Sequence, residues 1–223
     1  MLRAQFEKDL RQLHEEFHTM GEAVSLSVYK AVRAFIKQDN EIAQSVIQGD
    51  SKINEFESDL EKKGLEMIAL QQPVTSDLRL IITVMKAVND LERIGDHAVS
   101  ISKAAIRVNN TKPIFEIQEK ISDMADDVLK LLDDALHAYT EGNSEEAVLI
   151  ADRDEKINDY FKEIYEMCIR VMKEDSDLVE IGTDYLRVAR FLERIGDYVT
   201  NICEWIIYLK TGKIVELHSS NDE

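Results

Sequence analysis

The stretch LERIGD at residues 91–96 occurs again, unchanged, at residues 192–197. A longer match precedes each copy: MGEAVSLSVYKAVRAFIKQDNEIAQSVIQGDSKIN from Met20 aligns without a gap with MADDVLKLLDDALHAYTEGNSEEAVLIADRDEKIN from Met124. The offset is 104 residues in the longer match and 101 residues at LERIGD, and the difference falls where one half has QQPVTSD and the other has KEDSD. The chain is therefore an internal duplication, and its two halves are expected to share one fold.

Apolar residues recur through both halves at the three- and four-residue intervals of an amphipathic helix, and no alternating pattern typical of strands competes. The N-terminal series is Phe6, Leu10, Leu13, Phe17, Met20 and Val24. We expect six helices of about 25 to 33 residues, separated in part by the two prolines. Capping residues predict four of the helix starts: Asp39 or Asn40 for the second helix, Ser76 or Asp77 for the third, Asn143 or Ser144 for the fifth, and Ser176 or Asp177 for the sixth.

Three long helices with short connections form a bundle, so each half is predicted to be one bundle. The predicted fold class is all-α, with two tandem, pseudo-symmetric three-helix bundles made of six long helices. The first bundle spans residues 1–111 and the second spans residues 112–213. Residues 214–223 are expected to form a frayed acidic tail.

The composition excludes several classes of function. The 223 residues carry a net charge of −17: up to Thr111 there are 14 basic and 17 acidic residues (−3), and beyond it 13 basic and 27 acidic residues (−14). Such a surface repels the phosphates of nucleic acids. Two cysteines, Cys168 and Cys203, form no disulfide framework, which suits a reducing cytoplasm. No apolar run approaches a membrane span or a signal peptide, so we expect a cytoplasmic protein that neither crosses a membrane nor binds nucleic acid.

A carboxylate interrupts an apolar heptad line in each half. The line runs Leu78, Met85, Glu92, Val99, Ile106 in the third predicted helix and Val179, Leu186, Glu193, Thr200, Ile207 in the sixth. Asp96 and Asp197 follow one turn later on nearly the same face, so each helix presents two anions that repel one another. Carboxylates on a core-facing line are unfavourable unless they are paired or bound to a metal. Gly95 and Gly196 leave space where another helix or an ion would approach.

The second and fifth predicted helices supply further carboxylates. Phe161 stands where the first half has Glu57, so the pattern is incomplete in the second half. Oxygen ligands favour hard cations such as Mg²⁺, Mn²⁺ or Ca²⁺, leave iron open and make zinc less favoured. Di-iron chemistry of the ferritin type is disfavoured because glycine follows each glutamate at the position where that motif needs histidine. The predicted metal ligands are Glu92, Asp96, Glu193, Asp197, Asp50, Glu57 and Asp154.

A salt-bridge network is the alternative to a metal site. The side chains that could reach the carboxylates are those of Arg79, Arg93, Arg187 and Arg194. A single Glu-x-x-x-Asp pair is a weak signal, whereas its duplication on the interrupted lines strengthens the metal interpretation. His97 is left out of the ligand set because its counterpart in the second half is Tyr198.

The chain resembles the PhoU family. The resemblance rests on VIQGDSKIN, QQPVTSDLRLI and DLERIGDHA in the first half and on DRDEKIN and RFLERIGDYVTNICEWIIYLKTG in the second, and it covers nearly the whole chain. It implies two three-helix bundles, usually in a homodimer, with multinuclear metal sites at Glu92/Asp96 and Glu193/Asp197. Asn54 and Asn158 stand where the family has acidic residues.

The resemblance also implies a function. It implies a cytoplasmic negative regulator that links the ATPase subunit of a Pst-type phosphate importer to a PhoR-type sensor kinase, and that reaches the membrane only through these partners. It implies no enzymatic activity, which agrees with the lack of a nucleotide loop or nucleophile motif in the sequence. Two other interpretations stay open: a carboxylate-bound metal hydrolase acting on phosphate esters, and a purely structural helical scaffold.

Overall fold

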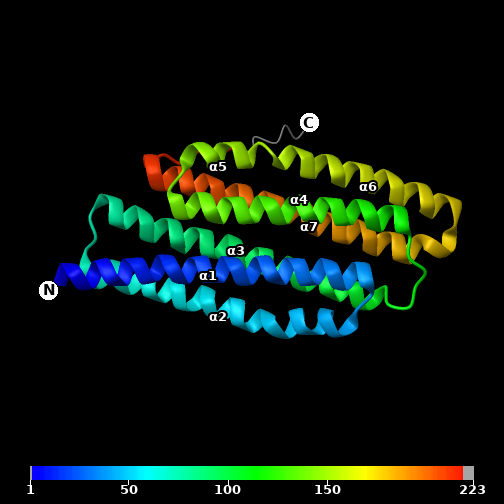
Figure 1. Cartoon of the computed structure of the whole chain (residues 1–223), viewed down its shortest axis with the longest axis horizontal. Coiled ribbons are helices and arrows are strands. Elements are labelled where there is room, and N and C mark those ends of the chain that lie inside the picture. Colours follow the sequence, from blue (N-terminus) through cyan, green and yellow to red (C-terminus); the bar gives the residue numbers. More distant parts are fainter. Residues whose placement is uncertain (1, 218–223) are drawn as a thin grey trace.

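The structure is a computed structural model that describes residues 2–217, and its helices lie along one long axis (Figure 1). In the first half α1 spans Leu2–Lys37, α2 spans Asn40–Gln71 and α3 spans Thr75–Arg107. In the second half α4 spans Phe115–Glu141, α5 Ser144–Ala151, α6 Asp154–Glu174 and α7 Val179–Thr211, and a 3₁₀ turn at Ser176–Leu178 precedes α7. Residues 2–217 contain no strand, so the predicted all-α class is confirmed.

Each half forms one bundle. Helices α1, α2 and α3 pack against one another, while α7 packs against α4, α5 and α6. The two bundles meet where α3 lies along α7 and α1 lies along α4, in the middle of the molecule in Figure 1. The loop between α3 and α4 joins the halves, and the predicted boundary at residue 111 falls in that loop. The predicted pair of tandem three-helix bundles is therefore confirmed.

The fifth predicted helix is interrupted, which the sequence analysis did not anticipate. Its first part is α5, of 8 residues, and its second part is α6, of 21 residues. A turn at Asp152 and Arg153 separates them. Counted as one interrupted helix, α5 and α6 complete the six predicted helices. The equivalent helix of the first half, α2, runs for 32 residues without a break.

Two of the predicted helix starts are confirmed. Asp39 caps α2, and its Oδ1 accepts hydrogen bonds from the backbone N–H of Glu41 and of Ile42, both at 3.0 Å. Asn143 caps α5 and accepts from the N–H of Glu146 at 3.1 Å. These side chains satisfy N–H groups that have no partner within the helix.

The other two predicted starts are wrong. Helix α3 begins at Thr75 after Val74, which makes no side-chain cap, so neither Ser76 nor Asp77 is the capping residue. Before α7, the carboxylate of Asp175 accepts from the N–H of Asp177 at 2.9 Å and starts the 3₁₀ turn Ser176–Leu178. The α-helix begins only after that turn. Each serine or aspartate in these segments is a plausible cap, and only the backbone geometry selects one.

The core runs through both bundles and buries most of the predicted periodic residues, while Phe6 and Leu10 are partly buried against it. Leu13, Phe17, Met20 and Val24 of α1 are fully buried. No helix within residues 2–217 combines the length and the apolar character that a membrane span requires. In the predicted tail, the N–H of Leu217 donates to Glu204 Oε1 at 2.7 Å. The part of the tail after residue 217 lies outside the described residues.

Candidate metal centre

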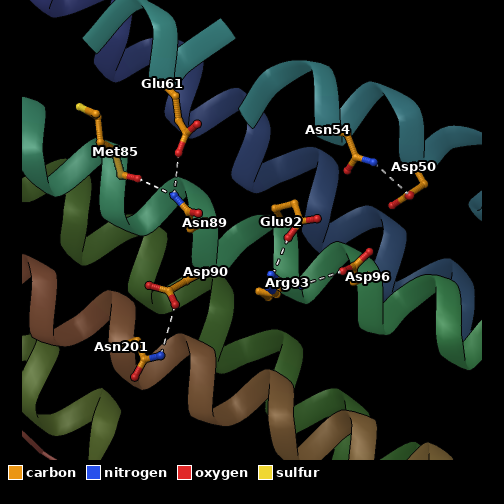
Figure 2. A network of polar contacts seen from close by, with 10 residues as sticks. All are labelled: Asp50, Asn54, Glu61, Met85, Asn89, Asp90, Glu92, Arg93, Asp96 and Asn201. Atoms are coloured by element: carbon orange, nitrogen blue, oxygen red, sulfur yellow. Dashed lines mark hydrogen bonds and ion pairs between the residues drawn. The ribbon is translucent and has the colours of Figure 1, made fainter. Parts of the chain in front are cut away.

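The first carboxylate cluster lies between α2 and α3. Figure 2 shows Asp50 on α2 together with Glu92 and Asp96 on α3. Gly95 is what lets α2 approach: a Cβ atom there would lie 3.3 Å from the side chain of Ile53 and 3.9 Å from Asp50 Oδ1. The position predicted for a close approach is therefore the one at which the second helix of the half does approach.

Four of the predicted ligands share one electrostatic environment in this cluster. The pKa of Glu92 is raised by burial first, and then by the negative charges of Asp96, Glu57 and Asp50. Burial and then Asp96 raise the pKa of Asp50. Burial and then Glu61 raise the pKa of Glu57, and Asp96 adds to that rise. The negative charges of Asp50, Glu57, Glu92 and Asp96 therefore act on one another in this structure.

The protein compensates this first cluster only weakly. Arg93 Nε lies 3.6 Å from Glu92 Oε2, and Arg93 Nη1 lies 3.4 Å from Asp96 Oδ2. The arginine side chain is 61% exposed, so water screens both contacts. Asp50 Oδ1 is buried and accepts no hydrogen bond from the residues that the structure describes. Its other oxygen, Oδ2, meets Asn54 Nδ2 at a long 3.5 Å.

The second carboxylate cluster lies between α6 and α7. Asp154, the first residue of α6, is 1% exposed, and its carboxylate occupies the space that a Cβ atom would need at Gly196. Asn158 Nδ2 donates to Asp154 Oδ2 at 3.2 Å. The pKa of Glu193 is raised by burial first and then by Asp197, with a smaller contribution from Asp154. Asp154 and Asp197 thus both act on the charge of Glu193.

Arginines compensate this second cluster more closely than the first. Arg190 Nη1 lies 2.6 Å from Glu193 Oε1, and Arg194 Nη1 lies 3.2 Å from Asp197 Oδ2. Arg190 was not among the arginines that the sequence analysis proposed. Its position three residues before Glu193 is the signal that could have found it, because residues three apart are neighbours on a helix.

Two of the four arginines proposed to form a salt-bridge network contact the carboxylate clusters, and two lie elsewhere. Arg93 and Arg194 reach the clusters, as that alternative proposed. Arg187 instead contacts Asp184 at 3.4 Å. Arg79 lies beside Gly212, at the end of α7. The ion pairs therefore use the same carboxylates as the predicted metal sites.

The donor chemistry of the clusters fits a hard cation. All predicted ligands offer oxygen, which Mg²⁺, Mn²⁺ and Ca²⁺ prefer. Two buried oxygens, Asp50 Oδ1 and Glu193 Oε2, accept no hydrogen bond from residues 2–217, so each retains lone pairs that a cation could use. Within the same residues, no three His, Cys, Asp or Glu side chains are already gathered around one point as a coordination shell. The ligand set stays a prediction.

Two contacts between α3 and α7 that involve polar residues could not be found from the sequence. Asn201 Nδ2 of α7 donates to Asp90 Oδ1 of α3 at 3.2 Å (Figure 2), and burial raises the pKa of Asp90 to about 6. His97, which was left out of the ligand set, stacks on Phe191 of α7 with ring centroids 5.5 Å apart. A single aspartate or histidine in the sequence gives no signal for such a contact.

Comparisons with known proteins agree with this fold. Residues 17–105 and 121–206 match the sequence model of the PhoU domain. The chain is 41% identical over 219 residues to a phosphate-specific transport system accessory protein PhoU homolog of Clostridium acetobutylicum, which covers 98% of this chain and all of that protein. The crystal structure of the phosphate transport system regulatory protein PhoU from Streptococcus pneumoniae superposes with a TM-score of 0.89 at 34% identity, covering 95% of this chain and 99% of that one.

A second solved structure gives the same result. PhoU from Pseudomonas aeruginosa also superposes with a TM-score of 0.89, at 32% identity, and covers 93% of this chain and 100% of that one. Sequence and fold thus agree over nearly the full length of each protein compared. The chain belongs to the PhoU family.

Proposed function

We propose that this protein is an accessory regulator of phosphate uptake and of phosphate-responsive signalling, and that it acts by binding rather than by catalysis. The similar proteins from Clostridium acetobutylicum and Streptococcus pneumoniae are named accessory or regulatory proteins of phosphate transport. In this proposal the protein is a metal-binding adaptor between the ATPase subunit of a phosphate importer and a sensor histidine kinase. It represses the response to phosphate starvation.

The metal-binding part rests on one observation, the duplicated placement of carboxylates across a glycine. In each half a Glu-x-x-x-Asp pair faces an aspartate from the neighbouring helix, and the glycine inside the pair allows that approach. The chemistry that a hard cation supplies at such a place is neutralisation of the repelling carboxylates. The residues proposed to hold it are Asp50, Glu57, Glu92 and Asp96 in the first half and Asp154, Glu193 and Asp197 in the second.

The adaptor part rests on charge and shape. A net charge of −17 is repelled by an anionic membrane surface, so association with a membrane transporter must go through protein contacts. Long helices with exposed outer faces offer extended surfaces for such contacts. We place the protein in the cytoplasm, at the inner face of the membrane when a partner is present, and we propose a homodimer.

Removal of the first cluster tests the metal-binding part. The Glu92→Gln, Asp96→Asn double variant is expected to bind less metal, measured by elemental analysis of gently purified protein. A chelator should lower the melting temperature of the unchanged protein more than that of the variant, because a ligand at 100 times its Kd stabilises a fold by about 2.7 kcal/mol. The exposed Asp59→Asn, Glu66→Gln double variant removes the same charge outside the cluster and is the control. Equal metal content in all three proteins would favour the salt-bridge interpretation.

Fractionation of cells tests the adaptor part. The protein should sediment with membranes when the importer or the sensor kinase is present and stay in the supernatant when both are deleted. Deletion of the protein should raise the expression of phosphate-starvation genes. Membrane association that persisted without both partners would contradict the proposal.

The metal hydrolase acting on phosphate esters is the second candidate. The exposed side chain of Arg93 beside Glu92 is the observation that favours it, because phosphate-ester hydrolysis needs a cation that faces the substrate. Turnover of a phosphate ester by metal-loaded protein, lost in the double variant of Glu92 and Asp96, would put this candidate first.

A further inference from the structure

The two carboxylate clusters differ at two aligned positions, and the two differences touch each other. Phe161 occupies the place of Glu57, and Arg190 occupies the place of Asn89. The guanidinium carbon of Arg190 lies 5.3 Å from the centroid of the Phe161 ring, and Nη1 of the same arginine lies 2.6 Å from Glu193 Oε1. The second half has therefore exchanged a carboxylate and an amide for an aromatic ring and a cation that sit together at the cluster.

Asn89 does nothing comparable in the first half. Its Nδ2 donates to Glu61 Oε1 at 3.0 Å and to the backbone oxygen of Met85 at 2.9 Å, away from Glu92 (Figure 2). Among the described residues, the cation that contacts Glu92 is Arg93, whose Nε lies 3.6 Å from Glu92 Oε2 and whose side chain is largely exposed. The equivalent glutamate of the second half, Glu193, has a direct charged hydrogen bond.

The formal charges of the two clusters differ as a result. Among the described residues, counting each predicted ligand and each arginine in an ion pair with one, the first cluster is −3 and the second is −1. The first total comes from Asp50, Glu57, Glu92, Asp96 and Arg93, and the second from Asp154, Glu193, Asp197, Arg190 and Arg194. A divalent cation thus meets a larger uncompensated negative charge in the first half.

The position of Arg190 is also held in place by its surroundings. A guanidinium over an aromatic face is attracted to it. The side chain of Arg190 is 46% exposed, and that of Glu193, which it contacts, is 12% exposed. A cation that used both oxygens of Glu193 would have to break the 2.6 Å contact and leave Arg190 beside it. Repulsion between the two cations would then add to the loss of the hydrogen bond.

We propose that Arg190 is a built-in counter-ion of the second cluster, so that the two halves bind metal with unequal affinity and the first half binds more tightly. This inference rests on the proposed metal-binding function. A hydrogen bond to a charged group contributes about 1.5–3 kcal/mol, which corresponds to about 10- to 100-fold in affinity. Arg190 is therefore a residue that lowers the metal affinity of the second site relative to the first.

Titration of metal-free protein with Mn²⁺ by calorimetry tests the proposal when each cluster is measured by itself. The Glu193→Gln, Asp197→Asn background retains only the first cluster, and the Glu92→Gln, Asp96→Asn background retains only the second. The first background is expected to bind Mn²⁺ about 10- to 100-fold more tightly than the second. Circular dichroism checks that both backgrounds remain helical.

The decisive variant gives the second cluster the residue of the first half. Arg190→Asn in the background with only the second cluster should tighten Mn²⁺ binding by about 10- to 100-fold. Arg187→Asn removes an arginine one turn away that contacts Asp184 instead, and should leave the affinity unchanged. In the background that retains only the first cluster, the reverse exchange, Glu57→Phe with Asn89→Arg, should weaken Mn²⁺ binding by a similar factor.

The outcomes separate this inference from the proposed function. Equal affinities in the two backgrounds, or no change with Arg190→Asn, would overturn the role of Arg190 while leaving the metal site intact. Equal tightening by Arg187→Asn would also overturn it, because the effect would then be one of net charge only. Absence of Mn²⁺ binding in the unchanged protein and in every variant would overturn the metal-binding function itself, and the unequal affinities with it.

Discussion

The two halves place the same aspartate on different backbones. Asp50 lies inside the unbroken helix α2, whereas its counterpart Asp154 is the first residue of α6, immediately after the break that separates α5 from α6. Asp50 is partly exposed and Asp154 is 1% exposed. A helix N-terminus carries a partial positive charge that favours a carboxylate. A duplicated site can therefore keep its aspartate while the backbone around that aspartate changes.

Replacing the equivalent glycines Gly95 and Gly196 with alanine should give the largest difference in stability between the two halves. In Gly196→Ala the new methyl group takes the space of the Asp154 carboxylate, which has little room to move because it is buried. We expect a loss of about 3 kcal/mol in the free energy of unfolding from overpacking and a displaced buried polar group. In Gly95→Ala the nearest atoms are those of Ile53 at 3.3 Å, and the gain of about 1 kcal/mol in helix propensity should offset the tight contact.

Urea unfolding of both variants measures this difference. Equal losses would mean that α6 can shift away from α7 as easily as α2 shifts away from α3. The carboxylate of Asp154 would then not be held in place by the break before α6.

The fold could be predicted in outline because the pattern that encodes it is long. Helices of 27 to 36 residues with a buried face need a sustained apolar period, and each such period is visible in the sequence. Asp50 and Asp154 could be assigned as candidate ligands because the second and fifth predicted helices supply them at matching positions of the duplication. Duplication made both predictions stronger than either half alone would allow.

The rest depends on contacts that a single helix does not encode. The break between α5 and α6 is one case, because ordinary helix-forming residues flank it on both sides. Arg190 is another, since its pairing with Phe161 requires the register of α7 against α6. The contact of Asp90 with Asn201 likewise requires the packing of one bundle on the other. Such features arise from tertiary packing, which overrides local propensity.

The stability of the contact between the bundles should depend on pH through Asp90, a carboxylate that the second half lacks at the equivalent position. Asp90 aligns with Phe191, so only α3 brings a carboxylate to this position. Burial raises the pKa of Asp90 from 3.8 to about 6, against opposing hydrogen bonds from Asn201 and Trp205, while Glu204 raises it further and Lys86 lowers it. As the pH rises, Asp90 therefore ionises at a lower pH in the unfolded chain than in the folded protein.

The sign of the effect follows from proton linkage. Well below pH 3.8 Asp90 is protonated in both states, and its ionisation does not affect stability. Between pH 3.8 and about 6 the free energy of unfolding falls as the pH rises, and above that range the loss stays constant. We expect a loss of about 2 kcal/mol after allowing for the partial exposure of the side chain. Chemical denaturation of the unchanged protein and of Asp90→Asn at pH 4 and at pH 7 measures it: the variant should gain relative stability at pH 7. A difference that did not change with pH would show that Asp90 is not held in a raised-pKa environment.

The smallest expected difference in stability between the halves comes from the capping residues of the equivalent helices α2 and α5. Asp39 accepts from two backbone N–H groups at 3.0 Å and starts a helix of 32 residues, whereas Asn143 accepts from one at 3.1 Å and starts a helix of 8 residues. Replacing a capping side chain with alanine costs about 1 kcal/mol. We expect Asp39→Ala to lower the free energy of unfolding by that amount and Asn143→Ala to lower it by about half as much. In Asn143→Ala only one backbone N–H loses its partner, and the break after α5 confines the fraying to a short segment. Hydrogen exchange of the first-turn amides, combined with urea unfolding, separates local fraying from global loss. A larger global loss for Asn143→Ala would mean that the short helix α5 holds the second cluster in place, and that the interrupted half is the more cooperative of the two.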